Sequence, residues 1–87
     1  MSVPKNISFS PSNRKGKKYR VEFDLRGKTY VRHFGALGYD QYFDRTPLRL
    51  YSHLNHLDAK RRHRYYLRHG TSKDPLKAKY WANKYLW

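Results

Sequence analysis

Hydrophobic and polar residues alternate along residues 18–34, KYRVEFDLRGKTYVRHF. A period of two is typical of β-strands with one buried face, and Arg26-Gly27 can form the turn between two such strands. The pattern predicts a β-hairpin whose apolar face carries two facing aromatic pairs, Tyr19 with Phe34 and Phe23 with Tyr30. Because a lone hairpin is marginally stable, other elements must cover this face.

Two later segments repeat apolar residues at helical spacing. Asp58 can cap a helix over residues 59–69, and Gly70 can end it. Asp74-Pro75 is a start signal for a second helix that runs to the end of the sequence. Residues 48–56 are ambiguous between loop and helix. We therefore expect an α+β fold, with an N-terminal β-hairpin packed against two or three short C-terminal helices.

The first sixteen residues, MSVPKNISFSPSNRKG, are rich in Ser, Pro and Asn and poor in large apolar side chains. This composition predicts that residues 1–16 are a flexible, basic Ser/Pro arm. At 87 residues the chain has no room for two cores. Residues 17–87 are therefore expected to form a single small α+β domain.

Charge is the strongest functional signal in the sequence. Twenty Lys and Arg residues face six acidic ones, which gives a net charge of +14. Such an excess is typical of proteins that bind polyanions, nucleic acids above all. The absence of cysteine excludes disulfides and thiolate metal sites. No apolar run is long enough to span a membrane.

The predicted helix over residues 59–69 has two different faces. At 100° per residue, Ala59, His63, Tyr66 and Leu67 form a stripe that we assign to the core. On another side lie Arg61, Arg64, Arg68 and Tyr65, with Lys60 at the margin. Cations at this spacing repel one another unless a polyanion neutralises them, and the planar arginine fork suits phosphate. A merely solvated face is the alternative.

A second group of cations lies where the arm meets the first strand, in the run RKGKKYR. Together with the helix it completes the predicted nucleic-acid-binding set: Lys15, Lys17, Lys18, Arg20, Lys60, Arg61, Arg64, Arg68 and Tyr65. No helix-turn-helix, homeodomain or zinc-finger signature accompanies these residues. Since phosphate contacts carry no sequence information, we expect binding with low sequence specificity.

The C-terminal helix is apolar on two sides, with Trp81 and Tyr85 on one and Tyr80 and Trp87 nearly opposite. A helix of this kind is either deeply buried or shared between two partners. We therefore predict a homodimer through Leu76, Tyr80, Trp81, Tyr85 and Trp87. The alternative is that Leu86 and Trp87 fold back onto the hairpin of the same chain.

Catalytic and metal-binding interpretations have weak support. His53 and His56 are expected to contact phosphate or to cap local backbone, and His63 to lie at the edge of the core. The acidic pairs Glu22/Asp24 and Asp40/Asp44 sit among cations that would hold them in ion pairs. Gly35-Ala36-Leu37-Gly38 matches the G-x-x-G of an RNA-binding KH loop, but a bend with close-packed backbone is expected instead. We predict no enzyme activity, metal, cofactor or small-molecule substrate.

Several pieces of the sequence resemble, in combination, a family of small basic proteins of large double-stranded DNA viruses, including marseilleviruses, mimiviruses and chlorella viruses. The pieces are Lys18-Tyr19, His33-Phe34-Gly35, the helix from Asp58 to His69, and Leu86-Trp87. The resemblance covers about residues 17–87, and residues 44–57 depart from it. It implies a packaged protein that binds or condenses the viral genome, located in the virion and in the host nucleus or a cytoplasmic virus factory.

These observations predict a non-enzymatic protein that binds double-stranded DNA through its phosphates and serves genome packaging. One alternative is a structural virion protein whose basic face and aromatic C-terminus dock acidic capsid or core proteins. Another is binding of RNA or single strands, with Tyr65, Tyr42 or Tyr39 as stacking platforms.

Overall fold

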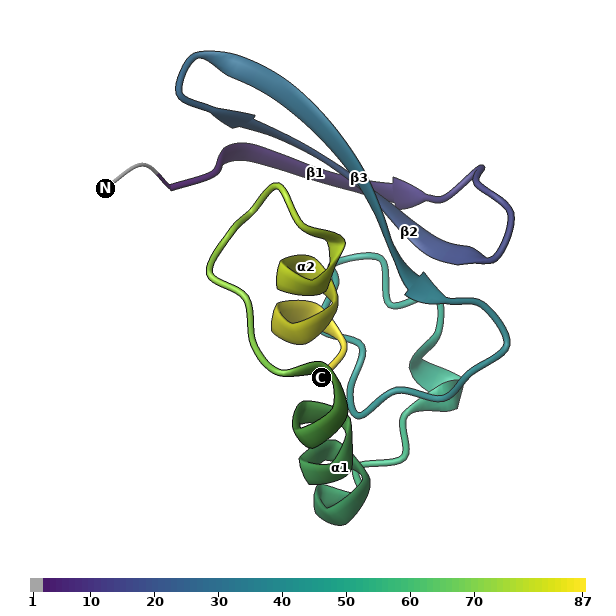
Figure 1. Ribbon diagram of the computed structural model, residues 1–87. Coiled ribbons are helices and arrows are strands. Elements are labelled where there is room, and N and C mark those ends of the chain that lie inside the picture. Colours follow the sequence, from purple (N-terminus) through teal and green to yellow (C-terminus); the bar gives the residue numbers. More distant parts are fainter. Residues whose placement is uncertain (1–2) are drawn as a thin grey trace.

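The computed structural model describes residues 3–87. Along the chain lie β1 (Lys5–Pro11), β2 (Lys17–Leu25), β3 (Lys28–Ala36), a 3-10 turn (Ser52–Leu54), α1 (Ala59–His69) and α2 (Ala78–Tyr85). The strands form one antiparallel sheet in the order β1-β2-β3. Helix α2 lies beneath the sheet, and α1 lies farther away from it (Figure 1). The α+β class is confirmed.

The β2–β3 hairpin has the predicted register. Tyr19 pairs with Phe34 and Phe23 with Tyr30, and the chain reverses at Arg26-Gly27. The rings of Phe23 and Tyr30 stack with centroids 5.9 Å apart. Alternation and turn chemistry are local properties, which is why they identify this element correctly.

The prediction of a flexible arm over residues 1–16 is wrong for β1, which pairs with β2 along the edge of the sheet. Its anchor is Phe9, whose ring contacts those of Phe34, Trp81 and Tyr85. The other side chains of β1 are mostly exposed, so its composition resembles that of a loop. Residues 1–2 of the predicted arm lie outside the described residues.

The core is a small aromatic cluster between the sheet and α2. It consists of seven buried side chains: Tyr19, Val21, Phe23, Leu25, Phe34, Trp81 and Leu86. Trp81 is fully buried, and its indole Nε1 donates to the carbonyl of Pro75 at 2.8 Å. A single chain therefore covers its own hairpin with α2, because Trp81 fills the space that the aromatic strands leave open.

This packing corrects part of the predicted self-association surface. Trp81 is not accessible to a second copy of the chain. Leu76, Tyr80, Tyr85 and Trp87 are partly buried against the same core. Leu86 packs against Gly35 of β3, as the fold-back alternative predicted. The homodimer itself remains a prediction.

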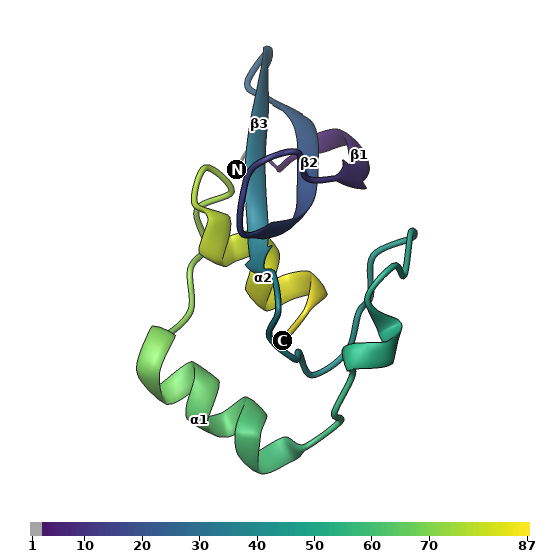
Figure 2. The same cartoon turned by 90° about the vertical axis from the view of Figure 1, so that its right-hand side faces the viewer.

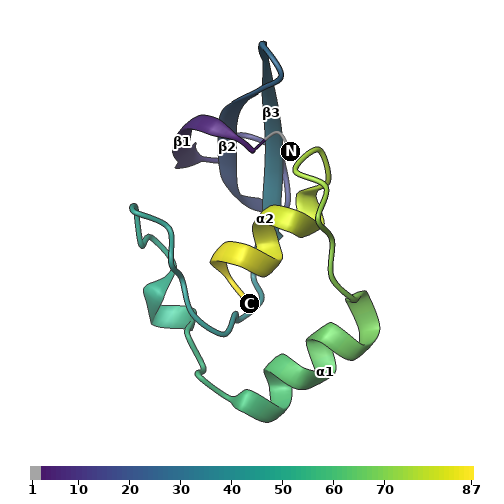
Figure 3. The ribbon, with the colours of Figure 1, turned by 90° about the vertical axis from the view of Figure 1, so that its left-hand side faces the viewer.

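A long segment between β3 and α1, residues 37–58, lies beside the C-terminal end of α2 (Figure 3). The carbonyl oxygen of Leu86 accepts hydrogen bonds from the backbone of Tyr42 and Phe43, at 3.0 and 3.1 Å. Gln41, buried, donates to the Tyr51 carbonyl and to the Asn55 side chain. These polar contacts, together with the ring of Tyr51 packed on Tyr19 of the core, hold the segment in place.

No helix within residues 3–87 combines the length and the apolar composition of a membrane span.

Candidate nucleic-acid interface

Helix α1 begins and ends where its capping residues predict. Asp58 Oδ1 accepts from the backbone N–H groups of Lys60 and Arg61, at 2.9 and 3.2 Å. These backbone hydrogen bonds, that of Arg61 foremost, lower the pKa of Asp58. At the other end the Gly70 N–H bonds to the Tyr66 carbonyl at 2.8 Å. The sequence of α1 is thus sufficient to define its two ends.

The predicted core stripe of α1 is wrong. All residues of this helix are at least partly exposed, and Leu67 is 72% exposed. Ala59 and His63 are exposed as well. Figure 2 shows the reason, because α2 lies between the sheet and α1. Since α2 and not α1 covers the sheet (Figure 2), no residue of α1 packs against the core cluster.

Three contacts attach α1 to the C-terminal part of the chain. The rings of Tyr65 and Trp87 are stacked, with centroids 4.3 Å apart and planes 4° from parallel. Arg62 Nε donates to the Trp87 carbonyl at 2.6 Å, and the Tyr66 hydroxyl donates to the Asn83 carbonyl at 3.2 Å. Burial in this stack raises the pKa of Tyr65 to about 12. These contacts turn the arginine-rich face of α1 toward the rest of the molecule.

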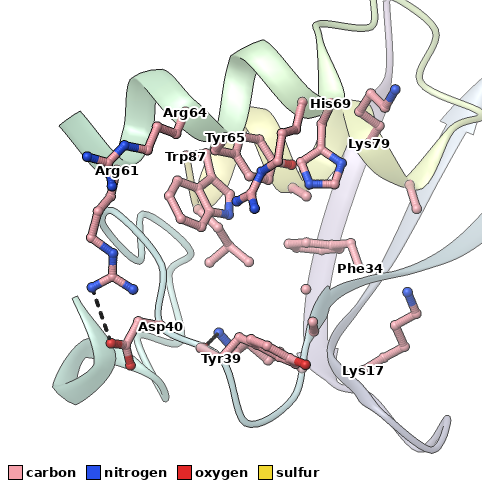
Figure 4. A pocket seen from close by; sticks show the side chains of 17 residues that line it. Lys17, Phe34, Tyr39, Asp40, Arg61, Arg64, Tyr65, His69, Lys79 and Trp87 are labelled. Atoms are coloured by element: carbon pink, nitrogen blue, oxygen red, sulfur yellow. Dashed lines mark hydrogen bonds and ion pairs between the residues drawn. The ribbon is translucent and has the colours of Figure 1, made fainter. Parts of the chain in front are cut away.

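Between α1, α2 and the ends of β2 and β3 lies a cleft of about 750 Å³. Figure 4 shows Arg61, Arg64, Tyr65 and His69 of α1 along one border. Arg68 also lines it, so the predicted stripe of three arginines and a tyrosine does face one space. Two lysines from other elements join them, Lys17 of β2 and Lys79 of α2. We call these seven residues, together with Trp87, Phe34 and Tyr39 on its walls, the basic cleft.

Among the described residues that line the basic cleft, one has an acidic side chain, Asp40. It pairs with Arg61, with Nη1 and Oδ2 3.6 Å apart, and both side chains are nearly half exposed (Figure 4). An exposed pair at this distance contributes little to stability. Arg64, Arg68, Lys17 and Lys79 therefore leave a net positive field inside the cleft, and an anion entering it would relieve their mutual repulsion.

Lys18 also lines the cleft, but its ammonium group is bonded within the protein and is not free to meet a phosphate. Its side chain is 2% exposed, and Nζ donates to the Tyr39 carbonyl at 2.5 Å and to Gln41 Oε1 at 2.6 Å. Desolvation lowers the pKa of Lys18, although the nearby Asp44 opposes the shift. The adjacent lysines of one strand thus have different environments, which their sequence does not reveal.

The remaining predicted cations lie outside the cleft. Arg20 forms an ion pair with Glu22 at 3.2 Å. Because its neighbours Tyr19 and Val21 are buried and side chains alternate along a strand, Arg20 lies on the sheet face opposite the core. Lys15 lies in the turn between β1 and β2, and Lys60 in the first turn of α1; both are exposed. They add to the overall positive field without lining the cleft.

Sequence reasoning missed Lys79 and Phe34 as cleft residues and named Tyr39 only in the alternative of single-strand binding. It also assigned Trp87 to self-association, whereas this side chain borders the cleft beside Tyr65. No local signal in the sequence distinguishes a residue that lines the cleft from one that does not. A lysine in a helix, for example, has the same helix propensity and periodicity whether it faces a cleft or solvent.

His56 and His63 differ in their surroundings. His56 Nδ1 accepts from the Asp58 N–H at 2.9 Å, which is the second of its two expected roles, the capping of local backbone. Desolvation, with the nearby charge of Arg61, lowers the pKa of His56. His63 is exposed rather than at the core edge. Within residues 3–87 no three His, Asp or Glu side chains gather closely enough to hold a metal ion.

Comparisons of the chain with models of protein families, with curated proteins and with solved structures found no match. The geometry of the basic cleft and the charge of the chain are therefore the basis for assigning a function.

Proposed function

We propose that this protein binds double-stranded DNA through its phosphates, without sequence specificity and without catalysis. The observation that carries the proposal is the convergence of Arg61, Arg64 and Arg68 with Lys17 and Lys79, from three elements, on one cleft. Each guanidinium can donate two parallel hydrogen bonds to a phosphate. The remaining exposed cations of a chain with net charge +14 extend the attraction beyond the cleft.

The absence of sequence specificity follows from how α1 is presented. Its arginines face the cleft and not an open helix surface of the kind that enters a major groove to read base edges. Phosphate oxygens are the same at every base pair, so contacts to them determine position and not sequence.

The biological setting that we propose comes from the resemblance over residues 17–87. The resemblance supports the proposal that this is a protein of large double-stranded DNA viruses, which is packaged in the virion and condenses or packages the genome. The proposed binding mode suits this setting, because a genome must be covered irrespective of its sequence.

The test is the salt dependence of binding to a labelled random duplex of about 20 base pairs, followed by fluorescence anisotropy. Each neutralised phosphate adds about 0.9 to the log–log slope, so the five cleft cations predict a slope of about −4 to −5. The double variant Arg64→Ala/Arg68→Ala is expected to reduce the slope by about 2 and to weaken binding equally for unrelated sequences.

A matched control removes the same charge elsewhere. Lys5→Ala/Lys28→Ala changes two exposed lysines on β1 and β3 outside the cleft. It is expected to change the slope much less than the arginine pair. Equal slopes for the two double variants would show that the cleft is not the binding surface. Loss of all duplex binding at about 0.1 M salt would favour an acidic protein partner instead.

A further inference from the structure

The basic cleft contains more than phosphate binding requires. Besides its cations it is lined by Trp87, Tyr39 and Phe34. Phosphate is a small hydrophilic anion and gains nothing from aromatic walls, whereas a nucleobase has an apolar face that stacks on them. The aromatic walls therefore suit the base of a nucleotide, and the cations suit its phosphate.

Trp87 is the central wall of this site. Tyr65 covers one face of its indole in a near-parallel stack, with centroids 4.3 Å apart. Trp87 is partly exposed and borders the hollow of the cleft, with Tyr39 on the opposite side (Figure 4). Tyr65, the ring of His56 at 5.2 Å and the Arg62 hydrogen bond to its backbone oxygen hold Trp87 in place. The indole is therefore a rigid wall on which a base in the cleft could pack.

Tyr39 forms a second wall of the cleft, and its ring is not needed for the fold. Its side chain is 71% exposed, and its part in the fold is played by its backbone carbonyl, which accepts the hydrogen bond from Lys18. An exposed tyrosine opposite an indole is the arrangement in which a flat ligand can be held between two rings.

The size and charge of the cleft identify the ligand. A volume of about 750 Å³ lies in the range of sites for single small molecules, roughly 300–1,000 Å³. Its interior has room for one nucleotide, while a continuous duplex can meet the exposed cations Arg61, Arg64, Arg68 and Lys79 from outside the cleft. Arg64, Arg68 and Lys79 line the same cleft as the aromatic walls, so the same nucleotide can present its phosphate to cations while its base lies on Trp87.

We infer that the basic cleft holds one unpaired nucleotide of the bound DNA, at an end or a gap of the duplex, with its base stacked on Trp87. The inference rests on the proposed function, since duplex contacts bring the strand to the cleft. Stacking tolerates any base, because every base has a π-face. The protein would thus prefer duplex ends and interruptions over continuous duplex, without reading sequence.

The test compares three DNA duplexes of the same sequence, about 20 base pairs long, with the full chain. One is blunt, one carries a single unpaired nucleotide at its 3′ end, and one carries an abasic nucleotide at that position. The unpaired base is expected to tighten binding about tenfold over the blunt duplex. The abasic duplex, which adds a phosphate without a base, is expected to bind nearly as the blunt one does. An unpaired 2-aminopurine should lose fluorescence on binding, because it stacks.

Tyr39→Ala is the informative variant, since replacing Trp87 would also remove its stack with Tyr65. It is expected to abolish most of the preference for the unpaired base, measured as the ratio of the affinities for the unpaired-base duplex and the blunt duplex. Phe43→Ala, at a partly exposed ring outside the cleft, is the matched control and should leave this ratio unchanged.

Two results would overturn the inference, and they differ in what they say about duplex binding. If the blunt duplex binds with a steep salt slope and the unpaired base adds nothing, the cleft is no base site and the proposed function stands. If none of the duplexes binds at about 0.1 M salt, the proposed function fails and the inference fails with it.

Discussion

The hydroxyl of Tyr19 donates a 2.5 Å hydrogen bond to the carboxylate of Asp44, which lies 25 residues farther along the chain and is fully buried. Asp44 also accepts from the Thr46 hydroxyl and from the Tyr51 backbone, at 2.6 and 3.1 Å. The Tyr19 oxygen in turn accepts from the Leu50 N–H at 2.9 Å. This network joins the 37–58 segment to β2, and the same segment supplies Tyr39 and Asp40 to the cleft.

Tyr19→Phe is expected to destabilise the fold by about 1–3 kcal/mol, because it leaves a buried carboxylate with one donor fewer. Urea denaturation measures the change. Tyr30→Phe is the control, since the Tyr30 hydroxyl makes no hydrogen bond within the described residues while its ring also faces the core. Equal losses for the two variants would show that the Asp44 contact contributes little.

Stability is expected to decline in alkali. Desolvation and the Asp44 contact raise the pKa of Tyr19 from 10.0 to about 12, and desolvation raises the pKa of Tyr65 to about 12. A phenol with a raised pKa in the folded state ionises more readily when unfolded, so its contribution is present below pH 10 and is lost between pH 10 and 12. Ultraviolet titration should show two late-ionising tyrosines, and Tyr19→Phe and Tyr65→Phe should each remove one. Titration of all tyrosines together near pH 10 would contradict this.

Gly35→Ala is expected to destabilise the protein more than Gly38→Ala. Both glycines have positive φ, 82° and 88°, so the backbone strain of an alanine is similar. A Cβ at Gly35 would lie 2.9 Å from Leu86 Cδ1 and 3.1 Å from Lys18 Cβ, whereas one at Gly38 would have nothing within 4 Å. Overpacking of this kind costs about 1–3 kcal/mol, and the difference between the two unfolding free energies measures it. Equal values would mean that Leu86 moves aside.

Neighbouring lysines are expected to behave differently in DNA binding. Lys17→Met removes a cation that lines the cleft and should reduce the log–log salt slope by about 0.9. Lys18→Met removes a buried cation that bonds to Tyr39 and Gln41, so it should lower stability and leave the slope unchanged. Salt titrations by anisotropy, with urea denaturation of both variants, test this. A slope change for Lys18→Met equal to that of Lys17→Met would show that Lys18 reaches DNA.

The elements that sequence reasoning identified correctly are those whose signals are local. The hairpin register follows from alternation around Arg26-Gly27, and both ends of α1 follow from Asp58 and Gly70. The common face of Arg61, Arg64, Arg68 and Tyr65 follows from helix geometry alone, and these residues do line one cleft. Turns, caps and faces depend on neighbours within a few residues, so a sequence determines them wherever the fold does not oppose them.

What only the tertiary structure decided is which surfaces are covered. Strand β1 forms because its backbone pairs with the edge of β2 and because the ring of Phe9 packs against the core. The polar composition of β1 indicates neither contact. Leu67 is exposed because Trp81 had already filled the space beneath the sheet. Lys17 and Lys18 both line the cleft, but Lys18 is buried and Lys17 is not, because Tyr39 and Gln41 return to accept the hydrogen bonds of the Lys18 ammonium group. The sequence by itself determined the positive charge and the periodic faces, whereas burial depends on contacts between distant segments and arises only when the chain is folded.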